Sequence, residues 1–167
     1  MTASGIIGIT MGDPSGVGPE IICKAMGDLD NEQRSATVVI AEPFFLQRAN
    51  DMLGTGLSFG PAFSPLPPGV VPVVEITGTD NDQVTPGTVS AAGGELAYRC
   101  IERAVELSLA GSIDVIVTAP LNKEALHASG HHFDGHTGLL THLTSSEQSF
   151  MLLTSEKLST VHVTTHV

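Results

Sequence analysis

The stretch that decides the fold is IIGITMGDPSGVGPE, residues 6–20. Residues 6–10 are an apolar run that predicts a short buried strand, and the glycines and prolines after it predict a tight turn into a helix. Pro19 suits the first turn of a helix, where no N–H partner is lost, and Glu20 complements the positive end of the helix dipole. A strand that runs directly into a helix is typical of a βαβ unit.

The glycine-rich turn of this stretch is also a candidate ligand loop, because N–H groups at the start of a helix bind anions. It lacks the Gly-Lys-Ser/Thr ending of the P-loop, and its spacing is not the G-x-G-x-x-G of the dinucleotide fingerprint. A purely structural turn explains it equally well. Asp13 is the side chain that we retain from it as a ligand candidate.

The same alternation of strand and helix continues along the chain. Apolar runs predict strands at residues 36–40, 70–76 and 113–118, the last of them buried, and helical periodicity predicts helices at residues 43–52 and 90–110. Pro72 favours an edge position for its strand, because proline cannot donate to the ladder. The pattern predicts an α/β fold with a mostly parallel sheet and helices on both faces.

A second strand-to-helix turn, TAPLNK at residues 118–123, supplies further candidates. Asn122 is suited to cap a short helix that stops at Gly130. Ligands of open α/β sheets bind at the carboxyl ends of strands, so Asn122 and Lys123 are ligand candidates. An ordinary solvent-facing lysine is an equally good interpretation of Lys123.

A change of composition near Gly130 predicts a domain boundary. Residues 1–130 are expected to form the N-terminal portion of a first α/β domain, and residues 131–167 to begin a second. A short helix at residues 138–143 and a hairpin of strands at 149–153 and 160–165 are predicted in this second part. The chain stops inside a β-branched run, so we expect a truncated piece of a longer protein.

All seven histidines lie between His127 and His166, and the first 126 residues hold none. Histidine is suited to metal ligation and to proton transfer near neutral pH, so the cluster marks a candidate site. Around His136 and Thr137, at the predicted start of a helix, an imidazole, a hydroxyl and free N–H groups surround a spot suited to an anion. His166 is a candidate metal ligand, but a metal site needs three or more ligands, and no convincing set is evident.

The composition excludes some partners. With 7 Lys plus Arg against 18 Asp plus Glu, the net charge of −11 argues against nucleic acid and against an anionic membrane surface. No apolar stretch is long enough to span a bilayer. The two cysteines lie in predicted helices and are expected to be buried free thiols, which favours the reducing cytoplasm.

Three ordered motifs together resemble the 4-hydroxythreonine-4-phosphate dehydrogenase family of vitamin B6 (pyridoxine and pyridoxal phosphate) biosynthesis. They are ITMGDPSGVGPE at 9–20, TAPLNK at 118–123, and GHT at 135–137 with TTH at 164–166. GELAYRC at 94–100 and NKEALH at 122–127 resemble a sister branch that oxidises threonate or erythronate 4-phosphate. The family usually has Glu after Gly-His-Thr, where this chain has Gly138.

The resemblance implies a fold similar to isocitrate and isopropylmalate dehydrogenases, in a family whose members are longer than this chain. It implies NAD or NADP as cofactor, a divalent metal such as Zn²⁺, Mg²⁺ or Co²⁺, and a homodimer with interfacial active sites. Substrate binding falls to His136 and Thr137, and metal ligation to His166. The implied reaction oxidises a four-carbon hydroxy-acid phosphate with decarboxylation. Two alternatives remain open: a non-catalytic phosphoacid-binding module, and a metal hydrolase built on the histidine cluster.

Overall fold

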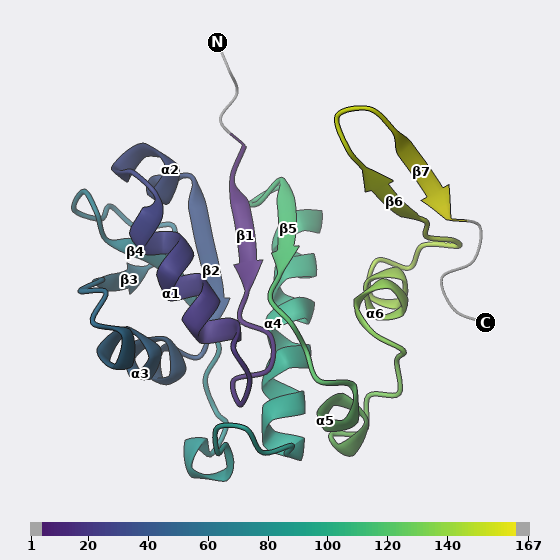
Figure 1. The fold of residues 1–167 in the computed structure, drawn as a ribbon, viewed down its shortest axis with the longest axis horizontal. Helices are drawn as coiled ribbons and strands as arrows, with labels where there is room; N and C mark the ends of the chain where they lie inside the picture. Colours follow the sequence, from purple (N-terminus) through teal and green to yellow (C-terminus); the bar gives the residue numbers. More distant parts are fainter. Residues whose placement is uncertain (1–4, 163–167) are drawn as a thin grey trace.

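A five-stranded, all-parallel sheet forms the centre of the molecule in a computed structural model that describes residues 5–162 (Figure 1). The strands follow the order β3-β4-β2-β1-β5. Their bounds are β1 Ile7–Thr10, β2 Thr37–Ala41, β3 Phe59–Pro61, β4 Val71–Glu75 and β5 Val115–Thr118. The predicted α/β class and parallel sheet are therefore confirmed.

Helices cover both faces of this sheet. The bounds are α1 Gly18–Asp28, α2 Asn31–Ser35, α3 Pro43–Leu53, the 3-10 turn η1 Asn81–Gln83, α4 Ala91–Leu109 and α5 Lys123–Ala128. The crossovers through α1 and α3 step in one direction along the sheet, and the crossover through α4 steps back. Since such crossovers are right-handed, α1 and α3 share one face and α4 lies on the other, as Figure 1 shows.

The core lies between these layers. Phe45 of α3, Ile40 of β2 and Leu96 of α4 are all fully buried. Cys23 and Cys100 are buried free thiols as predicted, and burial raises the pKa of Cys100 to about 12. Neither thiol is therefore suited to act as a nucleophile near neutral pH.

The edge position predicted for β4 is wrong, because β4 lies between β3 and β2. Val71 N donates to Ser58 O at 2.8 Å and Val73 O accepts from Ala62 N at 2.8 Å, so both of these residues bond toward β3. The alternation of bonding sides turns Pro72 toward β2. The ladder with β2 begins only at Val73, so the missing N–H of Pro72 costs no ladder bond.

The prediction of a buried β5 is also wrong. Val115 and Val117 are 51% and 45% exposed. Within residues 5–162, β5 pairs only with β1, which leaves it at the edge of the sheet. Apolar composition indicated the strand correctly but not its position.

After α5, the chain leaves the sheet. Helix α6, His136–Leu143, packs against α4, and the strands β6 Met151–Thr154 and β7 Ser159–His162 form a separate antiparallel hairpin. The predicted hairpin is confirmed as far as the described residues reach, and the domain boundary near Gly130 stays a prediction. Across the part of the chain that the structure describes, no helix has the length and apolar character needed to traverse a bilayer.

Candidate functional site

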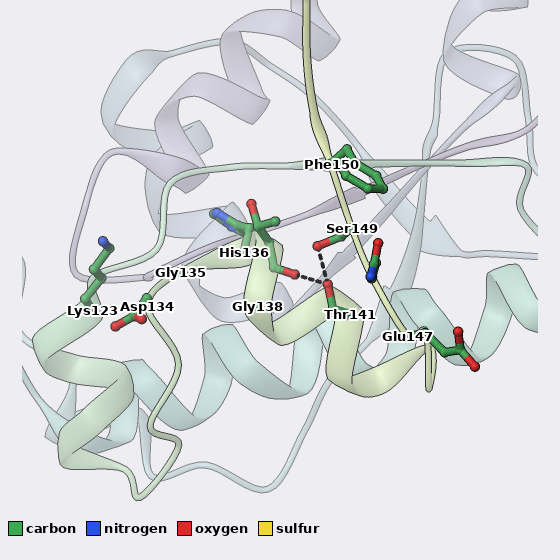
Figure 2. A pocket seen from close by; sticks show the side chains of 11 residues that line it. Lys123, Asp134, Gly135, His136, Gly138, Thr141, Glu147, Ser149 and Phe150 are labelled. Carbon is green, nitrogen blue, oxygen red and sulfur yellow. Dashed lines mark hydrogen bonds between the residues drawn. The ribbon is translucent and has the colours of Figure 1, made fainter. Parts of the chain in front are cut away.

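A cleft of about 830 Å³ lies where α5, α6 and the segment leading into β6 meet (Figure 2). It brings together three residues that the sequence analysis gave as ligand candidates: Lys123, His136 and Thr137. In Figure 2, Lys123 and Asp134 lie on one side of His136, and Thr141, Ser149 and Glu147 lie on the other. The remaining lining residues are Gly135, Gly138, Gln148 and Phe150.

Lys123 is positioned by the start of α5. Asn122 caps this helix as predicted, with its Oδ1 accepting from Ala125 N at 3.0 Å. Lys123 therefore begins the helix and is exposed toward the cleft. A Cβ built on Gly135 would lie 3.5 Å from Lys123 Cε, and Gly135 has a φ of 136°, which favours glycine. This glycine lets the start of α6 approach the lysine closely.

The amino end of α6 offers unbonded N–H groups to the cleft. The first helical hydrogen bond runs from Leu139 N to Gly135 O at 3.2 Å, so the N–H groups of residues 136–138 precede the ladder. No side chain caps them, and no acidic residue lies in the first turn. Leu139 is fully buried and anchors the helix. With the Lys123 ammonium nearby, this end of α6 is suited to bind an anion.

His136 faces the same spot. Its Nε2 atom is buried and has no hydrogen-bond partner among the described residues. Burial lowers the pKa of His136, and the backbone of Ala119 acts in the opposite direction. The neutral form of the ring is therefore favoured, and its unpartnered Nε2 can act as donor or acceptor, depending on the tautomer.

The lowered pKa of His136 predicts a pH dependence of stability. The unfolded chain binds the proton more readily, so the free energy of unfolding falls as the pH drops below the ordinary imidazole value of 6.5. Urea unfolding at about pH 7.5 and about pH 5.5 measures this loss. The variant His136→Gln, which cannot titrate there, is expected to lose less stability on acidification than the wild type. An equal loss in both proteins would contradict the assignment.

The far wall of the cleft was missed by sequence reasoning. Thr141 Oγ1 lies 2.7 Å from Thr137 O and 2.6 Å from Ser149 Oγ, which fastens the segment before β6 to α6 (Figure 2). The sequence carried a weak signal, because Thr137 and Thr141 are four residues apart and share a helix face. Nothing in it indicated that Glu147 and Phe150 return to the same cleft.

Gly138 has open space where its side chain would be, since no atom lies within 4 Å of a Cβ built there. The variant Gly138→Glu is expected to stabilise the protein by about 0.3–1 kcal/mol, because a carboxylate in the first turn complements the helix dipole. Urea unfolding measures this gain, and Gly138→Gln serves as the uncharged control. A Gly138→Glu protein no more stable than Gly138→Gln would contradict the helix-dipole explanation.

The histidines do not gather at one point. His131 Nε2 lies 2.8 Å from Glu95 Oε2, and its ring stacks on Tyr98 with centroids 3.5 Å apart. His127 Nε2 lies 3.0 Å from Phe133 O. Among the described residues, no group of three or more His, Cys, Asp or Glu is placed to hold a metal ion. The metal-hydrolase alternative gains no support, and His166 lies outside the described residues.

Asp13 lies outside the cleft. It lines a smaller hollow of about 140 Å³, together with Asn122, Ser15 and Thr88. Asn122 and Lys123 are consecutive, so the hollow and the cleft lie on either side of the turn that follows β5. The ligand-loop candidates are thus divided between two neighbouring spaces.

Comparisons with known proteins agree on one family. The model of the family "Pyridoxal phosphate biosynthetic protein PdxA" matches residues 32–167. D-threonate 4-phosphate dehydrogenase of Pectobacterium atrosepticum is 42% identical over 98% of this chain and 52% of its own length. 4-Hydroxythreonine-4-phosphate dehydrogenase of Trichlorobacter lovleyi is 38% identical over 96% of this chain and 49% of its own. The chain spans about half the length of these curated relatives.

Solved structures lead to the same family. The crystal structure of a 4-hydroxythreonine-4-phosphate dehydrogenase from Burkholderia phymatum superposes with a TM-score of 0.87 at 40% identity. The match covers 98% of this chain and 50% of that chain. The likeness therefore extends over nearly all of the sequence and includes both the sheet and the segment that carries the cleft.

Proposed function

Because the chain belongs to the family of pyridoxal phosphate biosynthetic proteins PdxA, we propose that it is part of a dehydrogenase acting on a four-carbon hydroxy-acid phosphate. The substrate is 4-hydroxythreonine 4-phosphate or threonate or erythronate 4-phosphate. D-Threonate 4-phosphate is the first to test, because the Pectobacterium relative carries that name. NAD or NADP accepts the hydride, a divalent metal (Zn²⁺, Mg²⁺ or Co²⁺) is required, and carbon dioxide is lost.

The observation that carries this proposal is the anion-binding corner of the cleft. Three unbonded N–H groups of α6, the exposed Lys123 ammonium and the His136 ring, whose Nε2 has no partner among the described residues, lie together at the cleft. This set matches a phosphate or carboxylate, and Thr137 adds a hydroxyl. Binding the anionic end of the substrate here would fix the position of the alcohol carbon relative to the nicotinamide.

The chemistry divides between the protein and its cofactor. A bound nicotinamide would supply the hydride acceptor for the alcohol carbon next to the carbon that bears the carboxylate. The product is a β-keto acid, which loses carbon dioxide readily. His136 and Thr137 hold the substrate. The general base that takes the alcohol proton is unassigned.

The metal is assigned more narrowly. The described residues do not form a group of three metal ligands. We propose that His166 supplies one ligand. The variant His166→Ala is expected to abolish metal-dependent turnover, and unchanged turnover would refute this assignment.

We further propose a cytoplasmic homodimer with active sites at the subunit interface. The β6–β7 hairpin supports the dimer, since Leu152 and Leu153 are consecutive, point to opposite sides, and are 59% and 50% exposed. Phe150 and Val161 are also exposed. An isolated two-stranded hairpin is only marginally stable in water, so a further surface, either of a partner subunit or of the remainder of a longer protein, is expected to cover it.

The deciding experiment is an NADH-formation assay of the full-length protein. Each four-carbon phosphoacid is supplied with NAD or NADP and with Zn²⁺, Mg²⁺ or Co²⁺. Turnover with one of these substrates, absent from its dephosphorylated form, supports the proposal. Tight phosphoacid binding without any reduction of the cofactor would instead favour the non-catalytic binding module.

A further inference from the structure

The hollow lined by Asp13, Ser15 and Asn122 lies at the topological switch point of the sheet. From β1 the chain crosses through α1 to β2 on one side, whereas from β4 it crosses through α4 to β5 on the other side of β1. The loop after β1 leads to α1 and the loop after β5 leads to α5, at the lower end of these strands in Figure 1. Open α/β sheets bind ligands outside the carboxyl ends of their strands, at such a switch point.

The walls of the hollow are fixed without a ligand. Asp13 N donates to Pro120 O at 3.0 Å, which joins the loop after β1 to the loop after β5. Gly87 N donates to Ser15 O at 2.7 Å, which adds the loop before α4. Gly12 has a φ of 70°, and a Cβ there would overlap the carbonyl of Pro120. The three loops therefore form a preorganised site.

Polar groups in this hollow are left without partners. Ser15 is 7% exposed, and its Oγ is buried with no hydrogen-bond partner among the described residues. Asp13 is 5% exposed; one of its carboxylate oxygens accepts from Ser15 N at 2.9 Å, and no described residue donates to the other. A Cβ built on Gly93 would lie 2.9 Å from Asp13 Oδ1 and 3.3 Å from Ser15 Oγ, so both face the first turn of the long helix α4. A buried unpaired hydroxyl is unfavourable until a ligand satisfies it.

The chemistry of the lining selects the class of ligand. No Lys or Arg is among the residues that line the hollow, and the Asp13 carboxylate disfavours an anion. A single carboxylate does not make a cation site. A carboxylate acceptor beside the hydroxyls of Ser15 and Thr88 and the amide of Asn122 instead suits a neutral group with neighbouring hydroxyls. The volume of about 140 Å³ suits one small sugar ring.

We propose that this hollow holds a ribose of the nicotinamide dinucleotide, with the Asp13 carboxylate accepting hydrogen bonds from its two hydroxyls. Ser15 Oγ and the Asn122 amide supply the remaining bonds. The assignment rests on the proposed dehydrogenase function, and it places the cofactor next to the substrate cleft, because Asn122 and Lys123 are consecutive. If the sugar is the adenosine ribose, Asp13 also repels the 2′-phosphate of NADP.

Calorimetric titration of the full-length protein tests this without turnover. Ser15→Ala and Asp13→Asn are each expected to weaken NAD binding about tenfold or more. Ser15→Ala removes a hydrogen bond to the ribose, and Asp13→Asn removes the charge that strengthens one. Asp82→Asn, at an exposed carboxylate outside the hollow, is the matched control and should bind NAD as the wild type does. Phosphoacid binding without NAD should be unchanged in all three variants.

Two fragments identify the ribose. If Asp13→Asn weakens the binding of ADP-ribose, and also improves an otherwise weak binding of NADP, the hollow holds the adenosine ribose. If the same change weakens the binding of nicotinamide mononucleotide, and the wild type binds NAD and NADP with equal affinity, the hollow holds the nicotinamide ribose. Either result supports the inference.

The same measurements distinguish a failure of the ribose site from a failure of the proposed dehydrogenase function. Ser15→Ala removes no hydrogen bond that the described residues make, so its fold should be intact, as urea unfolding would verify. Wild-type NAD affinity in both Ser15→Ala and Asp13→Asn would overturn the ribose site and leave the dehydrogenase standing. A wild-type protein that binds phosphoacid but neither NAD nor NADP would overturn both.

Discussion

The variant Gly94→Ala is expected to lower the free energy of unfolding by about 2 kcal/mol or more. A Cβ on Gly94 would overlap the carbonyl of Ala125, so α4 and α5 pack with their backbones in contact at this point. The obstacle is backbone rather than the end of a flexible side chain, so the helices must separate. Urea unfolding measures the loss, which exceeds the gain of about 0.5–1 kcal/mol that alanine normally gives in a helix.

The matched control is Gly27→Ala in α1. Gly27 also lies in a helix, but nothing stands within 4 Å of a Cβ built there. The same substitution should therefore be neutral or stabilise by up to about 1 kcal/mol. Because α5 begins at Lys123, Gly94→Ala should also weaken phosphoacid binding, whereas Gly27→Ala should not. A Gly94→Ala protein as stable as the control would show that the two helices can move apart at little cost.

The variant His136→Ala is expected to raise the KM for the phosphoacid about 10–100-fold while kcat changes much less. Hydrogen bonds to charged groups contribute roughly 1.5–3 kcal/mol, which sets this range. His136 lines the cleft, and its Nε2 has no hydrogen-bond partner among the described residues. Steady-state kinetics of the full-length protein with calorimetric titration of the phosphoacid measures the effect.

His132→Ala is the control for this result, because His132 is exposed and does not line the cleft. It should leave KM and kcat unchanged. A His136→Ala protein in which kcat falls and KM stays constant would assign the imidazole to the transition state rather than to binding. If His136→Ala lowers only the affinity for the metal, His136 is a metal ligand and not a substrate-binding residue.

Local chemistry predicted much of the fold. The apolar run before Gly12, the proline at the start of α1 and the cap at Asn122 act within a few residues, and each appears as predicted. Helix α2 was missed, although its capping box of Asp30 and Gln33 was present in the sequence. A capping box alone is too short a signal to predict a helix when no apolar periodicity follows it.

Position within the sheet was beyond the reach of local patterns. Pro72 was expected at an edge, but it tolerates an inner strand because the ladder to β2 starts one residue later. Val115 and Val117 were expected to be buried because they are apolar, yet both are exposed, since their strand lies at the edge of the sheet within residues 5–162. The tolerance of Pro72 and the exposure of the two valines both depend on which strands lie next to theirs. The sequence of one strand does not specify its neighbours in the sheet.

In the candidate site, too, local features were predicted and contacts between distant segments were not. His136 and Thr137 were identified because they are adjacent at a helix start, and the structure brings Lys123 to them. The histidine cluster marked a candidate site, but of the described histidines His136 alone lines the cleft, and His131 contacts Glu95 and Tyr98 instead. Thr141 and Ser149 were missed, since their meeting depends on how the segment after α6 folds back.

The place of β1 in the sheet has a consequence for the order of assembly during synthesis. The first strand of the chain pairs on one side with β5, and Ile6 N donates to Asp114 Oδ2 across 108 positions at 2.7 Å. A nascent chain can therefore form β1 to β4 early, but β1 keeps one edge open until β5 has left the ribosome. Closing so long a loop is slow, so this pairing is expected to limit the folding rate. The hollow lined by Asp13 and the cleft lined by His136, which both depend on the turn after β5, would form only after that step.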